Sequence, residues 1–165
     1  MANPPGSFIW YELMTPDPDA IAPFYAAVIG WTIRAAEPAQ SGGMDYRMIG
    51  RSDGKFAGGV LRLSADMQQH GAGPLWLGYL STPDVDGQLS AIVADGGKIQ
   101  MPATNLPNVG RIAMVADPQG VPFYLMAPVP PPGAADATSD VFDRHATQRV
   151  NWNELASPDL AASKA

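Results

Sequence analysis

The chain has 165 residues, 46% of them hydrophobic, and carries 16 acidic against 10 basic residues, a formal net charge of -6. This length predicts one domain with a substantial core, and an acidic chain without a basic stripe argues against a nucleic-acid partner. The absence of cysteine excludes disulfides and thiolate metal ligands. No run approaches the roughly 18 apolar residues of a membrane span, and residues 1–7 lack the features of a signal peptide. We therefore expect a cytoplasmic protein that does not enter a membrane.

The first predicted module covers about residues 8–66. Thr15-Pro16-Asp17 follows an apolar run and provides a helix cap, and Gly30 is suited to end that helix. Ser52-Asp53-Gly54 is a strong turn signal between two strands. The predicted elements are, in chain order, a strand over 8–13, a helix over about 18–29, a strand over 31–34 and a hairpin of strands over 46–49 and 56–63.

The same βαβββ order returns over about residues 74–127. Thr82-Pro83-Asp84 repeats Thr15-Pro16-Asp17 after 67 residues, and the turn glycines Gly54 and Gly120 lie 66 apart, so the chain contains an internal duplication. The predicted elements are a strand over 75–80, a helix over about 85–94, a short strand over 98–101 and a hairpin of strands over 111–116 and 121–127.

Beyond these modules the composition changes. Residues 128–148 are rich in Pro, Ala and Gly and predict a semi-rigid linker. Residues 149–165 then begin a third copy, since Trp152-Asn153-Glu154-Leu155 repeats Trp10-Tyr11-Glu12-Leu13. A single strand of this kind cannot bury its apolar face alone. It is expected to pair with another sheet edge, to remain unpaired, or to belong to a longer protein.

The duplicated module resembles those of the vicinal oxygen chelate superfamily, which includes glyoxalase I, bleomycin-resistance proteins and extradiol dioxygenases. Phe24-Tyr25 before Ile29-Gly30-Trp31, and Ala116-Asp117-Pro118-Gln119-Gly120 before the last strand, carry this resemblance. It implies an α+β domain over 8–127, in which two βαβββ modules form one incomplete barrel around a cleft. The third copy resembles the entry into a second domain, as in members with two domains in tandem.

The resemblance also implies where a metal would bind. Metal-dependent members use His, Gln or Glu side chains from the first and last strands of each module. At the corresponding positions this chain carries Trp10, Leu77, Gly58 and Tyr124, which are unsuited to a divalent cation. We therefore expect no metal site and no cofactor.

Glu12 complicates this expectation, because it lies two residues from Trp10 and points to the same sheet face. It is the candidate catalytic residue, either as a general base or as a displaced metal ligand. The alternative is a structural carboxylate paired with Arg62 or Arg111, since buried charges need partners.

Strand alternation predicts an aromatic cleft that suits a small apolar or aromatic molecule. The alternative is that these side chains are ordinary core. His70 is expected to be an exposed loop residue, and the aspartates at the two helix starts are expected to be caps. The predicted ligand-binding residues are Trp10, Glu12, Gly58, Leu77, Tyr79, Tyr124 and Met126.

These features predict a metal-independent small-molecule binding protein. The alternative is an enzyme, a lyase, isomerase or dioxygenase-like protein with a displaced or degenerate metal site. A third hypothesis is an interaction form, in which residues 149–165 add a strand to another chain. We expect a homodimer, with this tail as a candidate contact.

Overall fold

The computed structural model describes residues 3–35, 44–134 and 136–164 of the chain. These residues form two compact units, and the division between them falls within two strands. The first-module unit consists of the described residues within 10–78 and 140–151, and the second-module unit of those within 1–9, 79–139 and 152–165. Neither unit is therefore a continuous stretch of the chain.

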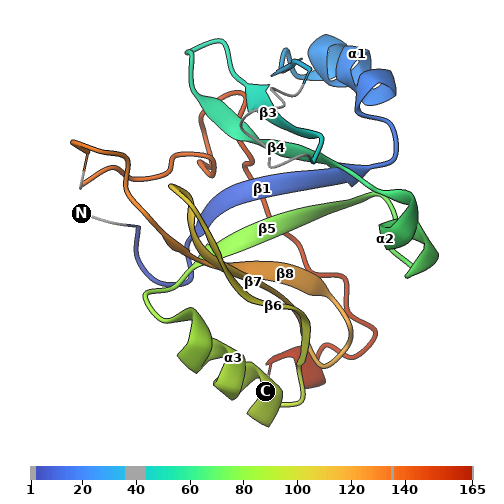
Figure 1. The fold of residues 1–165 in the computed structure, drawn as a ribbon, viewed down its shortest axis with the longest axis vertical. Helices are drawn as coiled ribbons and strands as arrows, with labels where there is room; N and C mark the ends of the chain where they lie inside the picture. The colour runs from blue at the N-terminus through green and yellow to red at the C-terminus, as the bar shows by residue number, and fades with distance from the viewer. Residues whose placement is uncertain (1–2, 36–43, 135, 165) are drawn as a thin grey trace. The chain divides into compact units, whose positions relative to one another are not determined.

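The first module has the predicted βαβββ order (Figure 1). Its sheet runs in the order β2-β3-β4-β1, with β4 parallel to β1 and antiparallel to β3. A second, short helix follows it. The elements are β1 (Phe8–Thr15), α1 (Pro18–Val28), β2 (Thr32–Ile33), β3 (Tyr46–Gly50), β4 (Phe56–Arg62) and α2 (Ala65–Gln69).

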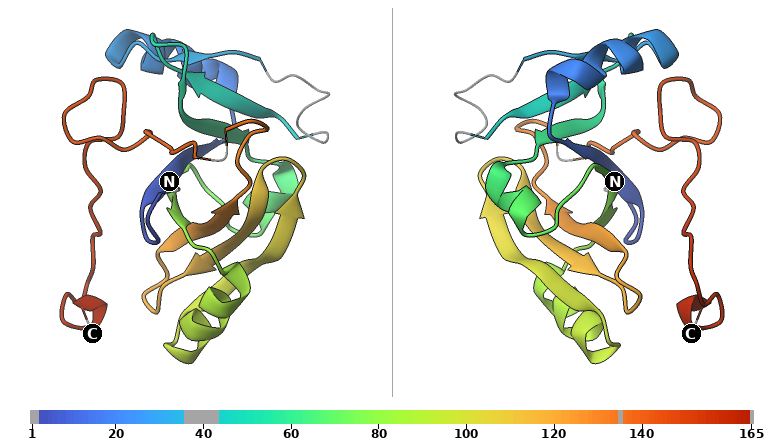
Figure 2. Two further views of the ribbon diagram at one scale, coloured as in Figure 1. Left: turned by 90° about the vertical axis from the view of Figure 1, so that its left-hand side faces the viewer. Right: turned by 90° about the vertical axis from the view of Figure 1, so that its right-hand side faces the viewer.

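The second module repeats this arrangement, and α3 contacts β6, β7 and β8 (Figure 2). Its sheet runs in the order β5-β8-β7-β6, again with the first and last strands parallel. The predicted α+β class and the duplicated βαβββ modules are thus confirmed. The elements are β5 (Leu75–Ser81), α3 (Val85–Ala94), β6 (Lys98–Leu106), β7 (Gly110–Ala116) and β8 (Pro122–Pro128).

Strand β6 is longer than the sequence predicts. The predicted strand covers 98–101, and the next residue is Pro102, which cannot donate to a ladder. In the structure β6 continues past Pro102 and pairs with β7 through two register shifts. These irregularities accommodate the proline.

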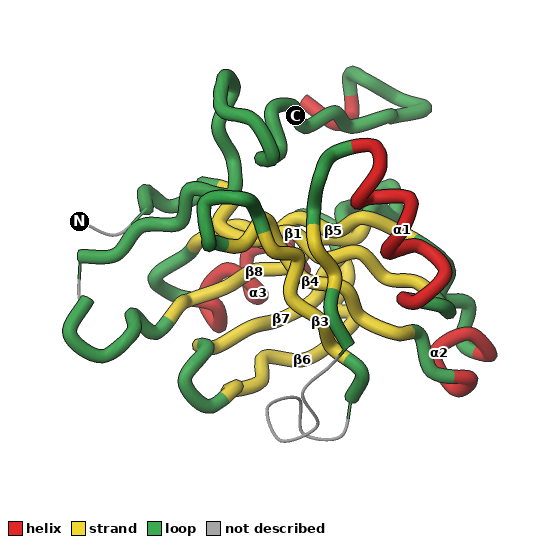
Figure 3. Tube along the Cα trace, turned by 90° about the horizontal axis from the view of Figure 1, so that it is seen from above, coloured by secondary structure: helices red, strands yellow, loops and turns green. Residues whose placement is uncertain are grey.

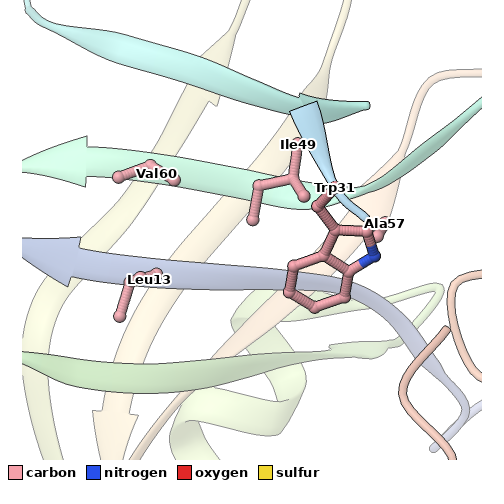
Figure 4. Close-up of a cluster of buried hydrophobic side chains, with 5 residues drawn as sticks. All are labelled: Leu13, Trp31, Ile49, Ala57 and Val60. Atoms are coloured by element: carbon pink, nitrogen blue, oxygen red, sulfur yellow. The ribbon is translucent and has the colours of Figure 1, made fainter. Parts of the chain in front are cut away.

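Helices α1 and α3 each pack on one face of their own sheet. In the first module a buried cluster joins β1, β3 and β4 to Trp31, which follows α1 (Figure 4). In the second module Val85 and Leu89 of α3 pack on the buried residues Ala113, Val115 and Leu125 of β7 and β8. Alternation along each strand therefore assigns every second side chain to the face opposite the helix. The first cluster consists of Leu13, Trp31, Ile49, Ala57 and Val60.

One corner motif occurs three times in the chain. In the first two copies the Asp of Thr-Pro-Asp accepts a hydrogen bond from an amide three residues on, and the Thr hydroxyl accepts one from the amide of that Asp. Ser157 and Asp159 make the same two bonds in the third copy, before a short helical turn at Ala162–Lys164. The third copy therefore folds its corner in the same manner as the other two.

The residues that precede the third corner form no strand in the described structure. The chain beyond β8 is drawn as loop apart from one short helical turn (Figure 3). The side chains of Trp152 and Leu155 are exposed. The apolar side chains of the segment that repeats β1 are thus solvent-accessible.

The end of the predicted linker and the first residues of the third copy pack against the first module. The side chain of Gln148, whose φ is +58°, donates to the carbonyls of Ile29 and Gly30 and accepts from the backbone and hydroxyl of Ser52. The Trp31 indole in turn donates to the Gln148 carbonyl at 3.0 Å. Residues 140–151 therefore act as a clasp across the end of α1 and the β3–β4 turn.

An ion cluster holds the same clasp. The side chain of Arg51 is fully buried and donates to Asp53 and Asp140, both at 3.0 Å. Arg149 pairs with the same two carboxylates. The Arg51 guanidinium beside Asp53 lowers the pKa of that carboxyl to about 2. A buried guanidinium needs such partners, because an uncompensated buried charge is strongly destabilising.

Removing the clasp should destabilise the first module, whereas removing only the third copy should not. A chain ending at Ser139 should lose about 3 kcal/mol of unfolding free energy, because Arg51 loses its Asp140 partner. A chain that ends at Asn151 retains this pair and serves as the matched control. Urea unfolding of both chains measures the difference, and equal stability would show that the clasp does not support the module.

Candidate functional site

In the first module the strand register defines the face opposite α1. Gly59 on β4 pairs with Glu12 on β1 and with Met48 on β3, so these three residues share one face. Val60 pairs with Leu13 and lies in the cluster beneath α1. We call the face opposite α1 the first-module distal face; it carries Trp10, Glu12, Tyr46, Met48 and Gly59.

A tryptophan–tyrosine pair spans this distal face. The Trp10 indole on β1 donates to the Tyr46 hydroxyl on β3 at 2.8 Å, and both side chains are half-buried. The Tyr46 ring reaches Trp10 by crossing β4 at Gly59, where a Cβ atom would overlap its ring and hydroxyl. Glycine at position 59 is therefore a requirement of this pair, since no other residue leaves room for the ring.

The register distinguishes Gly58 from Gly59. In the sequence, Gly58 and Tyr124 each lie four residues after the turn glycine of their hairpin, so they are expected to be counterparts. In the structure, Tyr124 pairs with Tyr79, whereas Glu12, which is equivalent to Tyr79, pairs with Gly59. A register irregularity at Ile49 and Gly50 accounts for the difference of one residue. Gly58 lies instead where a Cβ atom would meet the Tyr11 carbonyl.

Glu12 is buried, with 3% of its surface exposed. Arg62 lies on the α1 side of the sheet and donates to Asp45 and Asp19, so its predicted pairing with Glu12 is wrong. In the second-module unit Arg111 donates to Asp86. The Glu12 carboxyl therefore lies on the distal face, one strand from the site where Tyr46 crosses Gly59.

The second module carries a different set on its own face opposite α3. Tyr79 and Tyr124 lie in register and stack with their ring centroids 4.2 Å apart. Both are buried, and Met126 is the register partner of Ser81. Leu77, two residues before Tyr79 on β5, is also buried. The stacked tyrosines thus act as packing partners of each other.

The side chains on these faces do not fit a divalent cation. On the first-module distal face an indole and a phenol hydrogen-bond to each other, and Glu12 is the carboxylate that accompanies them. Within the described ranges no three His, Cys, Asp or Glu side chains are grouped closely enough to hold a metal ion. Structural and catalytic metal sites need three or four such ligands.

The remaining predicted candidates lie elsewhere. His70 is exposed at the end of α2, a helix that the sequence prediction missed although Ser64 caps it. Asp17 and Asp84 cap α1 and α3 as expected, whereas Asp19 and Asp86, also expected to be caps, pair with Arg47 and Arg111 instead. Among the described residues, no helix combines the length and apolar character needed to cross a membrane.

Tyr46 is the site residue that sequence reasoning missed. It is the first residue of β3, is distant from both repeated motifs, and has no counterpart that the duplication would identify. The pair of glycines at 58 and 59 was the available signal, because consecutive glycines within a strand mark a place where another group approaches closely.

The chain matches a described protein family over most of its length. Residues 7–125 match the model of the Glyoxalase/Bleomycin resistance protein/Dioxygenase superfamily. The Mycobacterium tuberculosis protein CFP32, whose name contains the word glyoxylase, is 32% identical over 130 residues, which cover 79% of this chain and 47% of that protein. The anthracycline biosynthesis protein DnrV of Streptomyces peucetius is 29% identical over 170 residues, covering 97% of this chain and 58% of that protein. The chain thus spans about half the length of these relatives.

Solved structures share the fold. A variant of Streptomyces coelicolor methylmalonyl-CoA epimerase in complex with 2-nitronate-propionyl-CoA matches with a TM-score of 0.52 at 20% identity, over 76% of this chain and 99% of that chain. A hypothetical protein from Bacillus halodurans matches with a TM-score of 0.54 at 12% identity, over 76% of this chain and 96% of that chain. At these identities the likeness concerns the fold alone.

Substitution of Gly59 should disrupt the Trp10–Tyr46 pair. Gly59→Ala places a methyl group where the Tyr46 ring lies, so we expect the ring to move and stability to fall by about 1–3 kcal/mol. Near-ultraviolet circular dichroism and urea unfolding measure the two effects. Gly73→Ala is the control, because a Cβ atom at Gly73 meets nothing within 4 Å. Equal behaviour of the two variants would contradict this account of Gly59.

Proposed function

Because the chain belongs to the Glyoxalase/Bleomycin resistance protein/Dioxygenase superfamily, we propose that it binds a small apolar or aromatic molecule without a divalent metal. The observation that carries this proposal is the hydrogen-bonded Trp10–Tyr46 pair on the first-module distal face, because Trp10 occupies a position at which the resemblance places a metal-ligating side chain. Two half-buried aromatic groups beside a carboxylate suit a planar molecule, since aromatic walls supply contact area and the polar atoms supply orientation.

The names of the relatives are consistent with this ligand class. The family description includes bleomycin resistance, and one relative is named for anthracycline biosynthesis. We take from these names a planar aromatic ligand as the starting hypothesis. Native mass spectrometry of freshly purified protein is the direct search for it, because an organic adduct retained by the protein gives the ligand mass.

Binding should not depend on a divalent metal. We expect anthracene-2-sulfonate, a planar fluorescent probe, to bind with the same affinity before and after EDTA treatment, because the distal-face side chains offer no metal-ligand set. Fluorescence titration measures the affinity. Loss of binding after chelation, with recovery on addition of Zn²⁺ or Mg²⁺, would overturn the metal-independent proposal. If the probe does not bind before or after EDTA treatment, the proposal of a planar aromatic ligand is wrong.

A second candidate function is metal-free isomerisation with Glu12 as the general base. The observation that favours it is the burial of Glu12 beside the aromatic pair, because a carboxylate in a water-poor site can have the basicity that proton abstraction requires. This role deepens the binding proposal, since the substrate would occupy the same face.

The homodimer expected from the sequence stays a prediction.

The Glu12→Gln variant tests whether the Glu12 carboxyl contacts the ligand or has a structural role. We expect the variant to fold and its affinity for anthracene-2-sulfonate to change, because the substitution replaces a buried carboxyl group on the distal face with an amide of nearly the same size. Glu154→Gln is the control, because this residue occupies the same position in the third copy but is exposed. Unchanged affinity in both variants would return Glu12 to a structural role.

A further inference from the structure

We propose that the outer side of α1, together with the start of β5, is the surface through which two copies of this chain associate. We call this surface the α1 patch; its large exposed side chains are Phe24, Val28, Leu75 and Trp76. The inference goes beyond the proposed function, because it concerns the α1 side of the first module rather than its distal face.

Helix α1 is apolar on its solvent side as well as on its sheet side. Ile21 and Tyr25 on the inner side pack on the buried cluster, and the helix lies on the outside of the first module (Figure 1). Seven of its 11 residues are exposed, and Asp19 is the only polar one among these seven. A helix that is apolar all round is normally buried on all sides, so we expect the outer side of α1 to be covered. The other six exposed residues are Ala20, Pro23, Phe24, Ala26, Ala27 and Val28.

Aromatic contacts hold the patch in one arrangement. The Trp76 indole donates to the Tyr25 hydroxyl at 3.1 Å, and the two ring centroids lie 5.8 Å apart. Tyr25 also packs edge-on to Phe24 and stacks on the buried Trp31. Phe24 and Trp76 nevertheless remain 59% and 37% exposed. Fixed but exposed aromatic side chains are typical of the centre of a protein–protein interface, because they offer a large contact area at a small cost in rotamer entropy.

The charge of the chain favours a second copy as the partner. The net charge is -6, so two copies repel each other where their charged surfaces meet. Residues 20–33 and 71–83, which supply the patch, contain no Asp, Glu, Lys or Arg. In a two-fold dimer each patch meets the same patch of the other copy, and an uncharged patch can face itself without like-charge repulsion. A lipid surface is a poorer match, since helices that bind one are rich in Lys and Arg, whereas Asp17 and Asp19 lie at the start of α1.

The outer side of α1 also complements itself in shape. Residues four apart form rows along a helix, so Ala20, Phe24 and Val28 lie in one row and the smaller Pro23 and Ala27 lie in the next. Two antiparallel α1 helices can therefore insert the large side chains of one copy beside the small row of the other. The patch is smaller than a standard interface of about 20–30 residues a side, so we expect a dissociation constant on the order of micromolar.

A charge introduced into the patch tests the interface. We expect sedimentation velocity of wild-type protein between about 1 and 100 µM to show a monomer–dimer equilibrium. Val28→Lys should weaken dimerisation about a hundredfold, because the two-fold relation places the new charge in the interface twice. The substitution changes the net charge from -6 to -5, so general repulsion between the copies cannot cause this loss.

Two variants serve as matched controls. Val28 lies at the end of α1 and Val93 near the end of α3, and these valines are 63% and 52% exposed. Leu155 is an exposed apolar residue of the third copy. We expect Val93→Lys and Leu155→Lys to dimerise as wild type does. An equal loss in Val93→Lys and Val28→Lys would overturn the proposal, and a loss in Leu155→Lys but not in Val28→Lys would assign the contact to the tail instead.

The wild-type protein alone can also overturn the proposal. A protein that stays monomeric at about 100 µM contradicts a dimer of the expected affinity, and cosedimentation of this monomer with phosphatidylcholine vesicles would assign the patch to a lipid surface. Should Val28→Lys not fold, hydrogen–deuterium exchange of wild-type protein at low and high concentration decides. Slower exchange of the α1 amides at the higher concentration supports the interface, and unchanged exchange contradicts it.

Discussion

The strand-to-helix corner is the constraint on which each module depends. Its hydroxyl and carboxylate satisfy the amides at the start of the helix, so the helix leaves the strand at a fixed residue and returns over one face of the sheet. That face receives Leu13 and its neighbours, and the pleat then assigns Trp10 and Glu12 to the other. A register slip of one residue would exchange the two sets. The three residues of the corner thus determine which side chains lie on the distal face.

The two copies of the module have used this shared backbone differently. In the second, Tyr79 and Tyr124 stack on each other and are buried, which satisfies them as core. In the first, the equivalent register pair is Glu12 and Gly59, and the missing side chain makes room for Tyr46 from the next strand. One copy therefore contributes packing at the position where the other contributes polar atoms. A duplicated fold can divide structural and chemical tasks in this way without any change of topology.

Much of the fold could be predicted from the sequence because its signals are local. The corner motifs, Gly30 and the hairpin turns each identify an element from a few adjacent residues, and α3 was placed correctly at both ends. The failures involve distant residues. The place of Gly59 depends on an irregularity in the pairing of β3 with β4, and the role of Tyr46 depends on a tryptophan 36 residues away. The clasp likewise joins residues separated by the whole second module, and its composition resembles that of a linker. No periodicity in the chain encodes such pairings.

The clasp also determines the order in which the protein can be completed during synthesis. The ribosome releases the strands of the first module early, but Arg51 does not meet Asp140 until the entire second module has been translated. The second-module unit depends in turn on residues 1–9, which are translated before the first module. Neither half is therefore a separable piece of the gene. A cut between the modules would divide both units. A circular permutation that brings residues 140–151 closer in sequence to the first module would shorten the longest loop that must close when the first-module unit folds.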